Sequence, residues 1–364
     1  MAELTGKERM SRILRRQSVD RIGVHETFWA ETSRKWMNDG YMKEGETLDG
    51  HFPFDLRNAW PFVVTADLDH QETVVEETAE TKLVRNGNGA LLRWWKNKAG
   101  TPEHVDFLVK DREGWREHVR PLVTDEGSYR RRINFEGYRK AKATAERKGQ
   151  FFCWSGINVF ECMHPVCGHE YMLMGMALDP AWVLDMCSVY AELTIRLMDI
   201  LFAEEGRPDG IWFYEDMGFK HKPFMSPAMY KELVWPAHRR TFEYCHSLNL
   251  PVIVHSCGYV APLVPGLIEA GMDCLQAMEV KAGMDLVELK QAYGDRIAFM
   301  GGMDVRTLVA NDRKAIQAEL DRKLPAAMAG GGYCLHSDHS IPNQVEYPTY
   351  KFFYERGLEM GTYR

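Results

Sequence analysis

Eight short apolar runs that alternate with helix-like segments predict an α/β protein with a parallel sheet. Each strand–helix–strand step is a βαβ unit, and eight such units close into a (β/α)8 TIM barrel. The chain has 364 residues, a length that such barrels reach as one domain, so we expect a single domain over residues 1–364. A doubly wound open sheet is the alternative fold.

Each predicted strand is a run of apolar residues that ends at a polar residue or a glycine. In chain order these runs are Gly23–Thr27, Phe62–Asp67, Phe151–Ser155, Gly210–Tyr214, Val252–His255, Asp273–Gln276, Ile297–Gly301 and Tyr333–His336. The segments between them have the apolar spacing of helices, most clearly in Ala181–Glu204, Pro227–Leu248, Asp285–Tyr293 and Asp312–Met328.

One segment, residues 72–110, does not fit this alternation. It has apolar and polar residues in turn on both sides of Asn86-Gly87-Asn88-Gly89, a pattern typical of a β-hairpin. We therefore expect an antiparallel hairpin inserted after the second barrel strand. It either covers part of the barrel mouth or is a surface flap without chemistry.

Composition excludes several classes of protein. Lys and Arg number 45 and Asp and Glu 52, so the net charge of −7 does not favour nucleic acid as a partner. The polar start Met1–Met10 is no secretory signal, and the longest stretch without charged residues, 244–268, is broken by three prolines and is no membrane span. Eight cysteines without framework spacing fit a reducing cytoplasm, where we expect this protein.

Polar residues follow the predicted strands, and in a barrel these strand ends share one face. We therefore expect the active site there. The strand-end residues, in chain order, are Glu26, Asp67, Asp69, Asn158, Glu161, Glu215, Asp216, His255, Cys257, Gln276, Glu279, Asp304, His336, Asp338 and His339.

The sharpest of these signals is His255-Ser256-Cys257-Gly258, which follows an apolar run. A histidine and a cysteine two residues apart at a strand end can bind one zinc ion, provided that a third ligand comes from elsewhere. The segment Cys334–His339 offers several candidates. The alternative is that His255 is a hydrogen-bonded core residue and Cys257 a buried thiol.

Two further groups of polar residues each allow a functional and a structural interpretation. The adjacent carboxylates Glu215 and Asp216 follow an aromatic run, where their pKa values can be driven apart so that one acts as general acid or base. The alternative is an acidic pair at a helix N-terminus. The cluster Cys162, His164, Cys167 and His169 does not match zinc spacings, and we interpret it as loop and core packing.

Several collinear motifs resemble the uroporphyrinogen decarboxylase superfamily over nearly the whole chain, which implies one (β/α)8 barrel. The resemblance rests on Lys7-Glu8-Arg9, Asp20-Arg21-Ile22, Glu215–Gly218, Met225-Ser226-Pro227, His255–Gly258, Ile268–Asp273, Leu289-Lys290, Tyr293–Ile297, Gly301–Asp304 and Gly331–Tyr333.

The superfamily implies two chemistries, cofactor-free decarboxylation of porphyrinogens and methyl transfer that uses a corrinoid protein and usually zinc. The decarboxylases have an Arg-Gln-Ala-Gly-Arg-Tyr signature after the first strand. Here that region, residues 25–31, contains no arginine and two acids, so it would repel a polyanionic tetrapyrrole.

The zinc pattern of the methyltransferases is H-x-C followed by a distant cysteine, and His255 and Cys257 match its first two positions. For the third position, the spacing favours Cys334, whereas the loop after the eighth strand aligns His339. The form Asp338-His339-Ser340-Ile341-Pro342 resembles the branch that demethylates small O-methyl donors.

The leading hypothesis is therefore a corrinoid-dependent methyltransferase (an O-demethylase) in which zinc acts as a Lewis acid and Glu215 or Asp216 protonates the leaving atom. The methyl donor is small, with an aryl methyl ether favoured by the aromatic content. The chain has no Asp-x-His-x-x-Gly motif, so we expect the corrinoid on a partner protein. The alternatives are a metal-free decarboxylase, the reverse transfer from methylcorrinoid to a thiol, and a non-catalytic corrinoid or tetrapyrrole binder.

Overall fold

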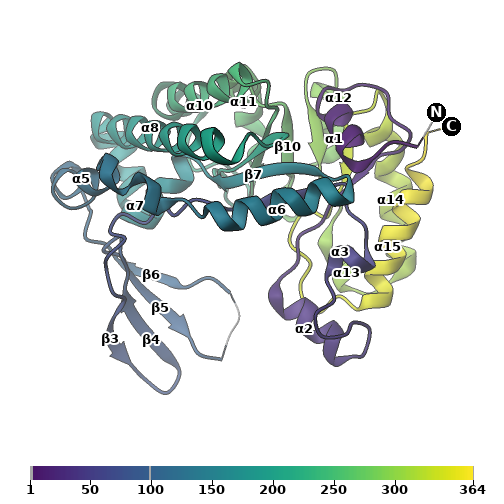
Figure 1. Cartoon of the computed structure of the whole chain (residues 1–364), viewed down its shortest axis with the longest axis horizontal. Coiled ribbons are helices and arrows are strands. Elements are labelled where there is room, and N and C mark those ends of the chain that lie inside the picture. Colours follow the sequence, from purple (N-terminus) through teal and green to yellow (C-terminus); the bar gives the residue numbers. More distant parts are fainter. Residues whose placement is uncertain (1–2, 98–99, 364) are drawn as a thin grey trace.

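A computed structural model describes residues 3–97 and 100–363. Its main sheet has eight parallel strands in the order β1-β12-β11-β10-β9-β8-β7-β2, so the chain passes once around a nearly closed barrel (Figure 1). This arrangement confirms the predicted (β/α)8 fold. The strands are β1 (Gly23–Val24), β2 (Leu56–Ala59), β7 (Phe151–Ile157), β8 (Gly210–Tyr214), β9 (Val252–Ser256), β10 (Cys274–Ala277), β11 (Ala298–Met300) and β12 (Tyr333–Leu335).

Helices surround the barrel, with short turns of other helical types between them. The α-helices are α1 (Gly6–Leu14), α2 (Ala30–Asn38), α3 (Leu48–His51), α4 (Arg112–Gly114), α5 (Arg120–Val123), α6 (Phe135–Lys148), α7 (Val159–Leu178), α8 (Pro180–Glu205), α9 (Pro227–Met229), α10 (Trp235–Ser247), α11 (Val264–Ala270), α12 (Leu286–Tyr293), α13 (Val305–Val309), α14 (Arg313–Met328) and α15 (Tyr347–Met360). The other turns are η1 (Trp115–Val119), η2 (Glu126–Arg132), η3 (Tyr230–Val234), η4 (Ala261–Leu263) and η5 (Val280–Ala282). None of the helices in residues 3–97 and 100–363 has the length and apolar character needed to cross a membrane.

The barrel closes between β1 and β2 through one backbone hydrogen bond and one side chain. The backbone N–H of Asp55 donates to the carbonyl of Val24 at 2.9 Å, and the Val24 N–H donates to the Asp55 carboxylate at 2.9 Å. Arg9 and Arg21 donate to the same carboxylate at 2.6 and 2.7 Å. One backbone hydrogen bond and a buried carboxylate therefore take the place of a longer ladder.

The floor of the barrel is a separate apolar cluster that α1 covers. Thr5 and Glu8 form a capping box that starts α1, and this orients Met10 and Ile13 toward the barrel. Alternate residues of a strand point to the same side of the sheet. Seven of the eight strands each contribute one or two inward-pointing residues to the cluster. Its buried members are Met10, Ile13, Leu14, Val19, Leu56, Phe151, Cys153, Trp212, Ile253, Cys274, Ala298, Met300 and Cys334.

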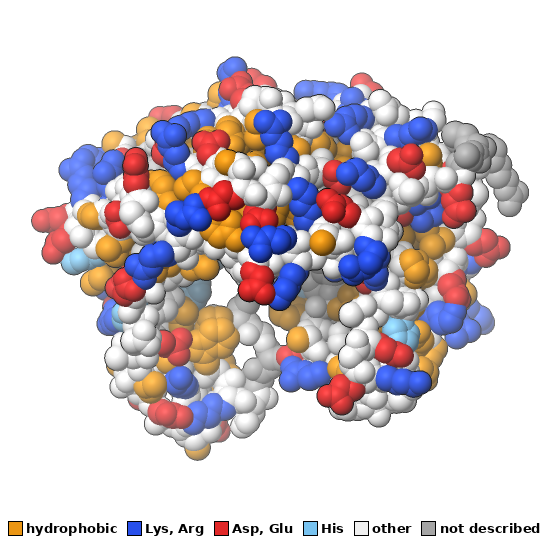
Figure 2. Space-filling view, in the orientation of Figure 1, with side chains coloured by type: hydrophobic (Ala, Val, Ile, Leu, Met, Phe, Trp, Pro, Cys, Tyr) orange, Lys and Arg blue, Asp and Glu red, His pale blue; other side chains and the backbone are white. Residues whose placement is uncertain are grey.

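The insertion is a four-stranded antiparallel sheet in the order β3 (Thr73–Glu77), β4 (Thr81–Arg85), β5 (Leu91–Trp95) and β6 (Glu103–Asp106). The predicted hairpin is its central pair, where the Asn86 N–H donates to the Ala90 carbonyl at 3.0 Å. In Figure 1 the sheet projects from the barrel on the same side as α2 and α3. Figure 2 shows a notch between these two projections.

The predicted second strand, Phe62–Asp67, is wrong, since β2 is Leu56–Ala59. Only Leu56 of this strand is buried, whereas Arg57 points outward and donates to Gln150 at 2.9 Å. Because the strand is mostly polar, its sequence does not show the apolar run expected of a barrel strand. The apolar side chain of Phe62 instead packs on the outside of the barrel, with its ring 5.0 Å from that of Trp154. Asp67 and Asp69 consequently do not follow a barrel strand.

The segment from Cys162 to His169 is not a loop as expected, because it lies within α7. The helix is interrupted at Gly168, whose φ of 67° is left-handed. All eight cysteines are free thiols. Cys162 and Cys167 are buried, as are all the others except Cys257, which is half-buried. The interpretation as core packing therefore holds for these two thiols.

Candidate metal centre and active site

Asp216, His255 and Cys257 meet at the carboxyl ends of β8 and β9. Nε2 of His255 lies 3.2 Å from Sγ of Cys257 and 3.3 Å from Oδ1 of Asp216. Candidate ligand atoms of all three lie within 4.8 Å of one another, and within residues 3–97 and 100–363 no other three His, Cys, Asp or Glu side chains do so. Two residues that sequence spacing singled out are therefore joined by a carboxylate from the neighbouring strand.

Two glycines let these strand ends approach each other. A side chain at Gly218 would lie 2.4 Å from the Cys257 carbonyl oxygen, and one at Gly258 would lie 2.3 Å from the Gly218 carbonyl carbon. Gly258 also has a φ of +75°, which side chains rarely tolerate. The backbone contact keeps Cys257 beside the loop that follows β8.

The orientation of His255 follows from its second nitrogen, since Nδ1 is hydrogen-bonded to Oε1 of Gln276 on β10. An amide oxygen only accepts, so Nδ1 holds a hydrogen, and Nε2 is the nitrogen that faces Asp216 and Cys257. The Tyr214 ring covers His255 at a centroid distance of 4.5 Å. This arrangement is typical of a metal-binding histidine with a supporting hydrogen bond.

The charges of the three groups depend on one another. Burial favours the neutral form of each, but the imidazole of His255 outweighs burial at Asp216 and lowers its pKa to about 2. Cys257 and Asp216 together raise the pKa of His255 well above its usual value, despite burial. Burial raises the pKa of the Cys257 thiol, although His255 opposes the shift. A positive charge at the centre of the group is therefore favoured.

Glu215, the other predicted acid, is fully buried and fully engaged. Its two oxygens accept from the backbone N–H groups of Phe160 and Glu161 at 3.1 and 2.8 Å, and Oε1 is 2.6 Å from Nε2 of His238. The side chain of Glu161 in turn accepts from the backbone N–H of Asp216 at 3.1 Å. Glu215 therefore anchors the start of α7, and Asp216 is the acid that lies in the site.

The two candidates for a third ligand lie elsewhere. Cys334 is buried in the barrel floor, below the strand end. His339 is exposed, and its ring stacks on Trp29 at 6.2 Å. Neither belongs to the group of Asp216, His255 and Cys257. Metal binding by Cys334 or His339 therefore remains a prediction.

Sequence reasoning gave no role to several residues that support the site. Gln276, Glu161 and Glu279 were visible as strand-end polar residues, and Glu279 accepts from the Gly258 N–H at 2.8 Å. Tyr214 ends a predicted strand whose last three residues are all aromatic, so nothing in the sequence separates it from the neighbouring core residues. His238 lies on α10, away from any strand end, so the sequence contained no signal for it.

A second polar group lies at the ends of β1 and β12. Glu26 accepts from the backbone N–H and the hydroxyl of Ser337, both at 3.0 Å, and Nδ1 of His336 is 3.2 Å from its Oε1. Burial raises the pKa of Glu26 to about 8, against the hydrogen bonds from Ser337 and Thr27. Glu26 and His336 are each almost completely buried.

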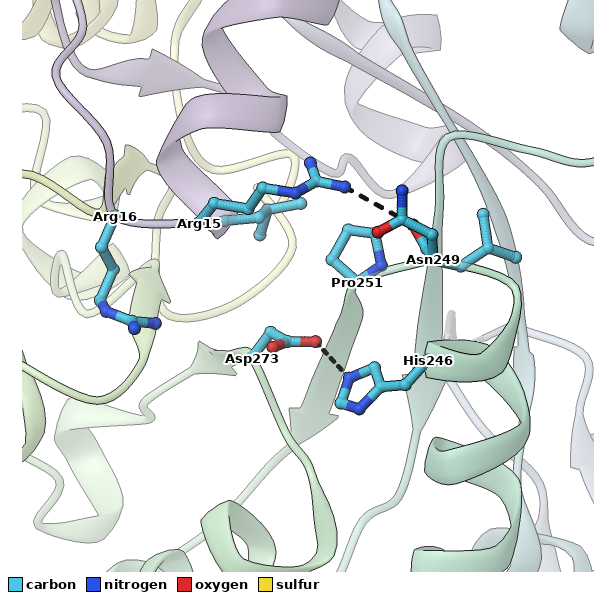
Figure 3. Close-up of a pocket in the computed structure, with 8 residues that line it drawn as sticks. Arg15, Arg16, His246, Asn249, Pro251 and Asp273 are labelled. Carbon is cyan, nitrogen blue, oxygen red and sulfur yellow. Dashed lines mark hydrogen bonds and ion pairs between the residues drawn. The ribbon is translucent and has the colours of Figure 1, made fainter.

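One cavity adjoins the site and another lies far from it. A cavity of about 300 Å³ borders Cys257 and is lined by Phe219, Lys220 and Lys281. A cavity of about 360 Å³ lies where β9 and β10 begin, at the opposite end of the barrel (Figure 3). The polar groups around this second cavity bind one another: Arg15 donates to the Asn249 carbonyl, and His246 pairs with Asp273 at 2.8 Å.

The fold and the site define a (β/α)8 barrel protein with nitrogen, sulfur and carboxylate donors gathered at the strand ends. The chain belongs to the uroporphyrinogen decarboxylase (URO-D) family, whose model matches residues 153–357, more than half of the chain.

Two relatives come from Methanosarcina mazei. A methylated-thiol–coenzyme M methyltransferase is 31% identical over 87 residues, which are 24% of this chain and 22% of that protein. This chain therefore matches less than a quarter of that relative's length. A methyltransferase of solved structure superposes over 98% of this chain and 99% of its own, with a TM-score of 0.69 and 16% identity. At that identity the likeness shows the fold.

Proposed function

We propose that this protein is a methyltransferase that moves a methyl group from a small O-methyl donor to the cobalt of a corrinoid on a separate protein. The observation that carries the proposal is the convergence of Asp216, His255 and Cys257 at the strand ends. Membership of the URO-D family and the methyltransferase named among its relatives support it.

The three side chains fit a zinc ion. They supply one nitrogen, one sulfur and one oxygen donor, and a catalytic zinc site has three protein ligands and an open position. The supporting hydrogen bond from His255 to Gln276 is the second feature of such sites. A zinc ion held there would supply Lewis-acid activation of the heteroatom that leaves the methyl group.

The chain's own residues provide orientation. Asp216 has a pKa lowered to about 2 and is ionised at neutral pH, so it can bind the metal and hold His255 in place, but it does not supply a proton. Tyr214 and Trp60, with ring centroids 4.5 Å apart, form an apolar wall beside His255. Such a wall suits the methyl-bearing part of a donor, including an aryl methyl ether, and excludes water from it.

A specific observation favours a second candidate, transfer from methylcorrinoid to a thiol. The curated relative is named for methylated thiols and coenzyme M, and its 87 matched residues are 31% identical. In that direction the same metal site would hold a thiol acceptor as its thiolate. The two candidates share the site and differ in the molecule that occupies it.

An assay with purified protein separates these functions. Protein with 2-methoxyphenol and cob(I)alamin should form methylcobalamin, followed by its absorbance, whereas Cys257→Ala should lose at least 99% of the rate. Demethylation of methylcobalamin by 2-mercaptoethanol, without activity on the ether, would support the thiol candidate. Carbon dioxide release from a carboxylic acid substrate without methyl transfer would contradict both.

A further inference from the structure

Inside the barrel, Nε2 of His336 and Nε1 of Trp212 are buried polar atoms with no hydrogen-bond partner among the described residues. His25 lies between them and bonds the backbone of Leu56, so at least one of its two ring nitrogens also lacks a partner. Buried polar groups are nearly always hydrogen-bonded, so this cluster indicates that a ligand or ordered water supplies the missing partners.

These side chains lie together inside the barrel. The ring of His25, after β1, is 5.9 Å from that of His336, after β12, and 5.5 Å from that of Trp212 on β8. Since β1 and β8 are not neighbours in the sheet, their side chains can meet only across the barrel interior. Trp212 in turn stacks on Tyr214 at 5.4 Å, which covers His255.

The hydrogen on His336 can be placed from its neighbours. Nδ1 lies 2.5 Å from the carbonyl oxygen of Ser337 and 3.2 Å from Oε1 of Glu26. A carbonyl oxygen can only accept, so Nδ1 holds the hydrogen. Burial, with the neighbouring His25, lowers the pKa of His336 to about 3, so the ring is neutral at neutral pH. Nε2 is then a buried lone pair that needs a donor.

We infer that His336, held in place by Glu26, accepts a hydrogen bond from a hydroxyl group of an uncharged small molecule bound in the barrel mouth. The inference rests on the proposed function in taking this molecule as the methyl donor or its demethylated product. His336 contacts the ligand, whereas Glu26 is a positioning residue. Trp212 and Tyr214 provide the aromatic surface for the rest of the molecule.

The surroundings disfavour a carboxylate in this place. Burial lowers the pKa of His25 to about 4, so both imidazoles are uncharged at neutral pH. Glu26, whose pKa burial raises to about 8, adds no positive charge that could balance a bound carboxylate. A hydroxyl group both donates to His336 and accepts from the indole N–H of Trp212.

Binding of two probes tests the inference without methyl transfer. The full chain, labelled with ¹⁵N in histidine and treated with EDTA, is titrated with phenol and with toluene, which lacks the hydroxyl. Long-range ¹H–¹⁵N spectra identify the protonated nitrogen of each ring, and His336→Gln assigns the signal. We expect His336 to be protonated at Nδ1, its Nε2 signal to shift with phenol, and toluene to bind about tenfold more weakly.

Variants distinguish contact from structure. His336→Phe should bind phenol about tenfold more weakly, while His336→Gln, whose amide oxygen can accept, should keep most of the affinity. Glu26→Gln should keep the Nδ1-protonated form, and Glu26→Ala should release the ring and lose the phenol-induced shift. His118→Gln, on η1, is the matched control and should change nothing.

Three results would overturn the inference: a hydrogen on Nε2 of His336, equal affinity for phenol and toluene, or no phenol binding. Equal affinities would mean that ordered water alone fills the site. None of these results depends on metal or corrinoid. A failure of methyl transfer with intact phenol discrimination would contradict the proposed function and leave this site standing.

Discussion

The backbone N–H of Cys257 donates a 2.8 Å hydrogen bond to Oδ1 of Asp216, which ties the loop after β9 to the loop after β8. The same oxygen lies 3.3 Å from Nε2 of His255. Oδ2 of Asp216 has no hydrogen-bond partner in the described part of the chain, which leaves it available to a ligand. Asp216 therefore organises the site and can also bind metal.

The first prediction concerns the identity of the third metal ligand. Asp216→Asn should weaken zinc binding at least tenfold, because the variant loses a charged oxygen donor. Zinc affinity is measured by competition with a chromogenic chelator. Cys334→Ser and His339→Gln serve as the matched comparisons, and both should bind zinc as the wild type does. A tenfold loss in either, with Asp216→Asn unaffected, would assign the third ligand differently.

The second prediction concerns the contact between Gly218 and Gly258. Gly258→Ala should lower the free energy of unfolding by several kcal/mol, since its new methyl group would lie 2.3 Å from the carbonyl carbon of Gly218. Gly45→Ala is the matched control, because Gly45 has a similar φ of +84° with nothing within 4 Å. It should cost only about 1 kcal/mol. Equal costs in urea unfolding would show that the close contact contributes nothing.

The third prediction concerns barrel closure at Asp55, which is 3% exposed. Asp55→Asn should lower the free energy of unfolding by about 3–5 kcal/mol, since it leaves the buried guanidinium of Arg9 with a weaker set of acceptors. The exposed pair Lys231–Glu269 is the control, and Glu269→Gln should cost under about 1 kcal/mol. Denaturant unfolding of both variants measures the difference. Similar values for the two would rule out this closing role.

The fourth prediction concerns the pH dependence of stability. Burial raises the pKa of Glu26 from the usual 4.5 to about 8. Between these values the folded chain keeps a proton that the unfolded chain has lost, so the Glu26 contribution to stability falls as pH rises. Glu26→Gln removes this contribution. The free energy of unfolding of the wild type, relative to the variant, should fall by up to about 1.4 kcal/mol per pH unit over this window. Parallel curves from pH 4.5 to 8 would contradict the shift.

Most of the barrel could be predicted because its strands are continuous apolar runs. Phe151–Ile157 and Val252–Ser256 are almost wholly buried, so their sequences record burial on both faces of the strand. The strand Leu56–Ala59 escaped prediction since only Leu56 is buried, and a two-residue strand such as Gly23–Val24 has little pattern of its own. The outer strands of the insertion were missed because their residues are mostly exposed.

Part of the site could be predicted because it is local. His255 and Cys257 are two residues apart, and the alternation of a strand places them on one side. The partners of this pair come from other strands, where loop geometry decides what meets. Cys334 precedes His336 by two residues, so it lies roughly 7 Å lower along β12, in the floor. The spacing of residues along the chain does not show that Cys334 lies in the barrel floor, away from the strand ends where His255 and Cys257 lie.

The proposed activity requires a metal ion bound by Asp216, His255 and Cys257. The most direct test is elemental analysis of the purified wild type and Cys257→Ala, with Cys245→Ala, which changes a buried thiol on α10, as the control. We expect close to one zinc per chain in the wild type and the control, and little in Cys257→Ala. Equal trace amounts of metal in all three would contradict the account.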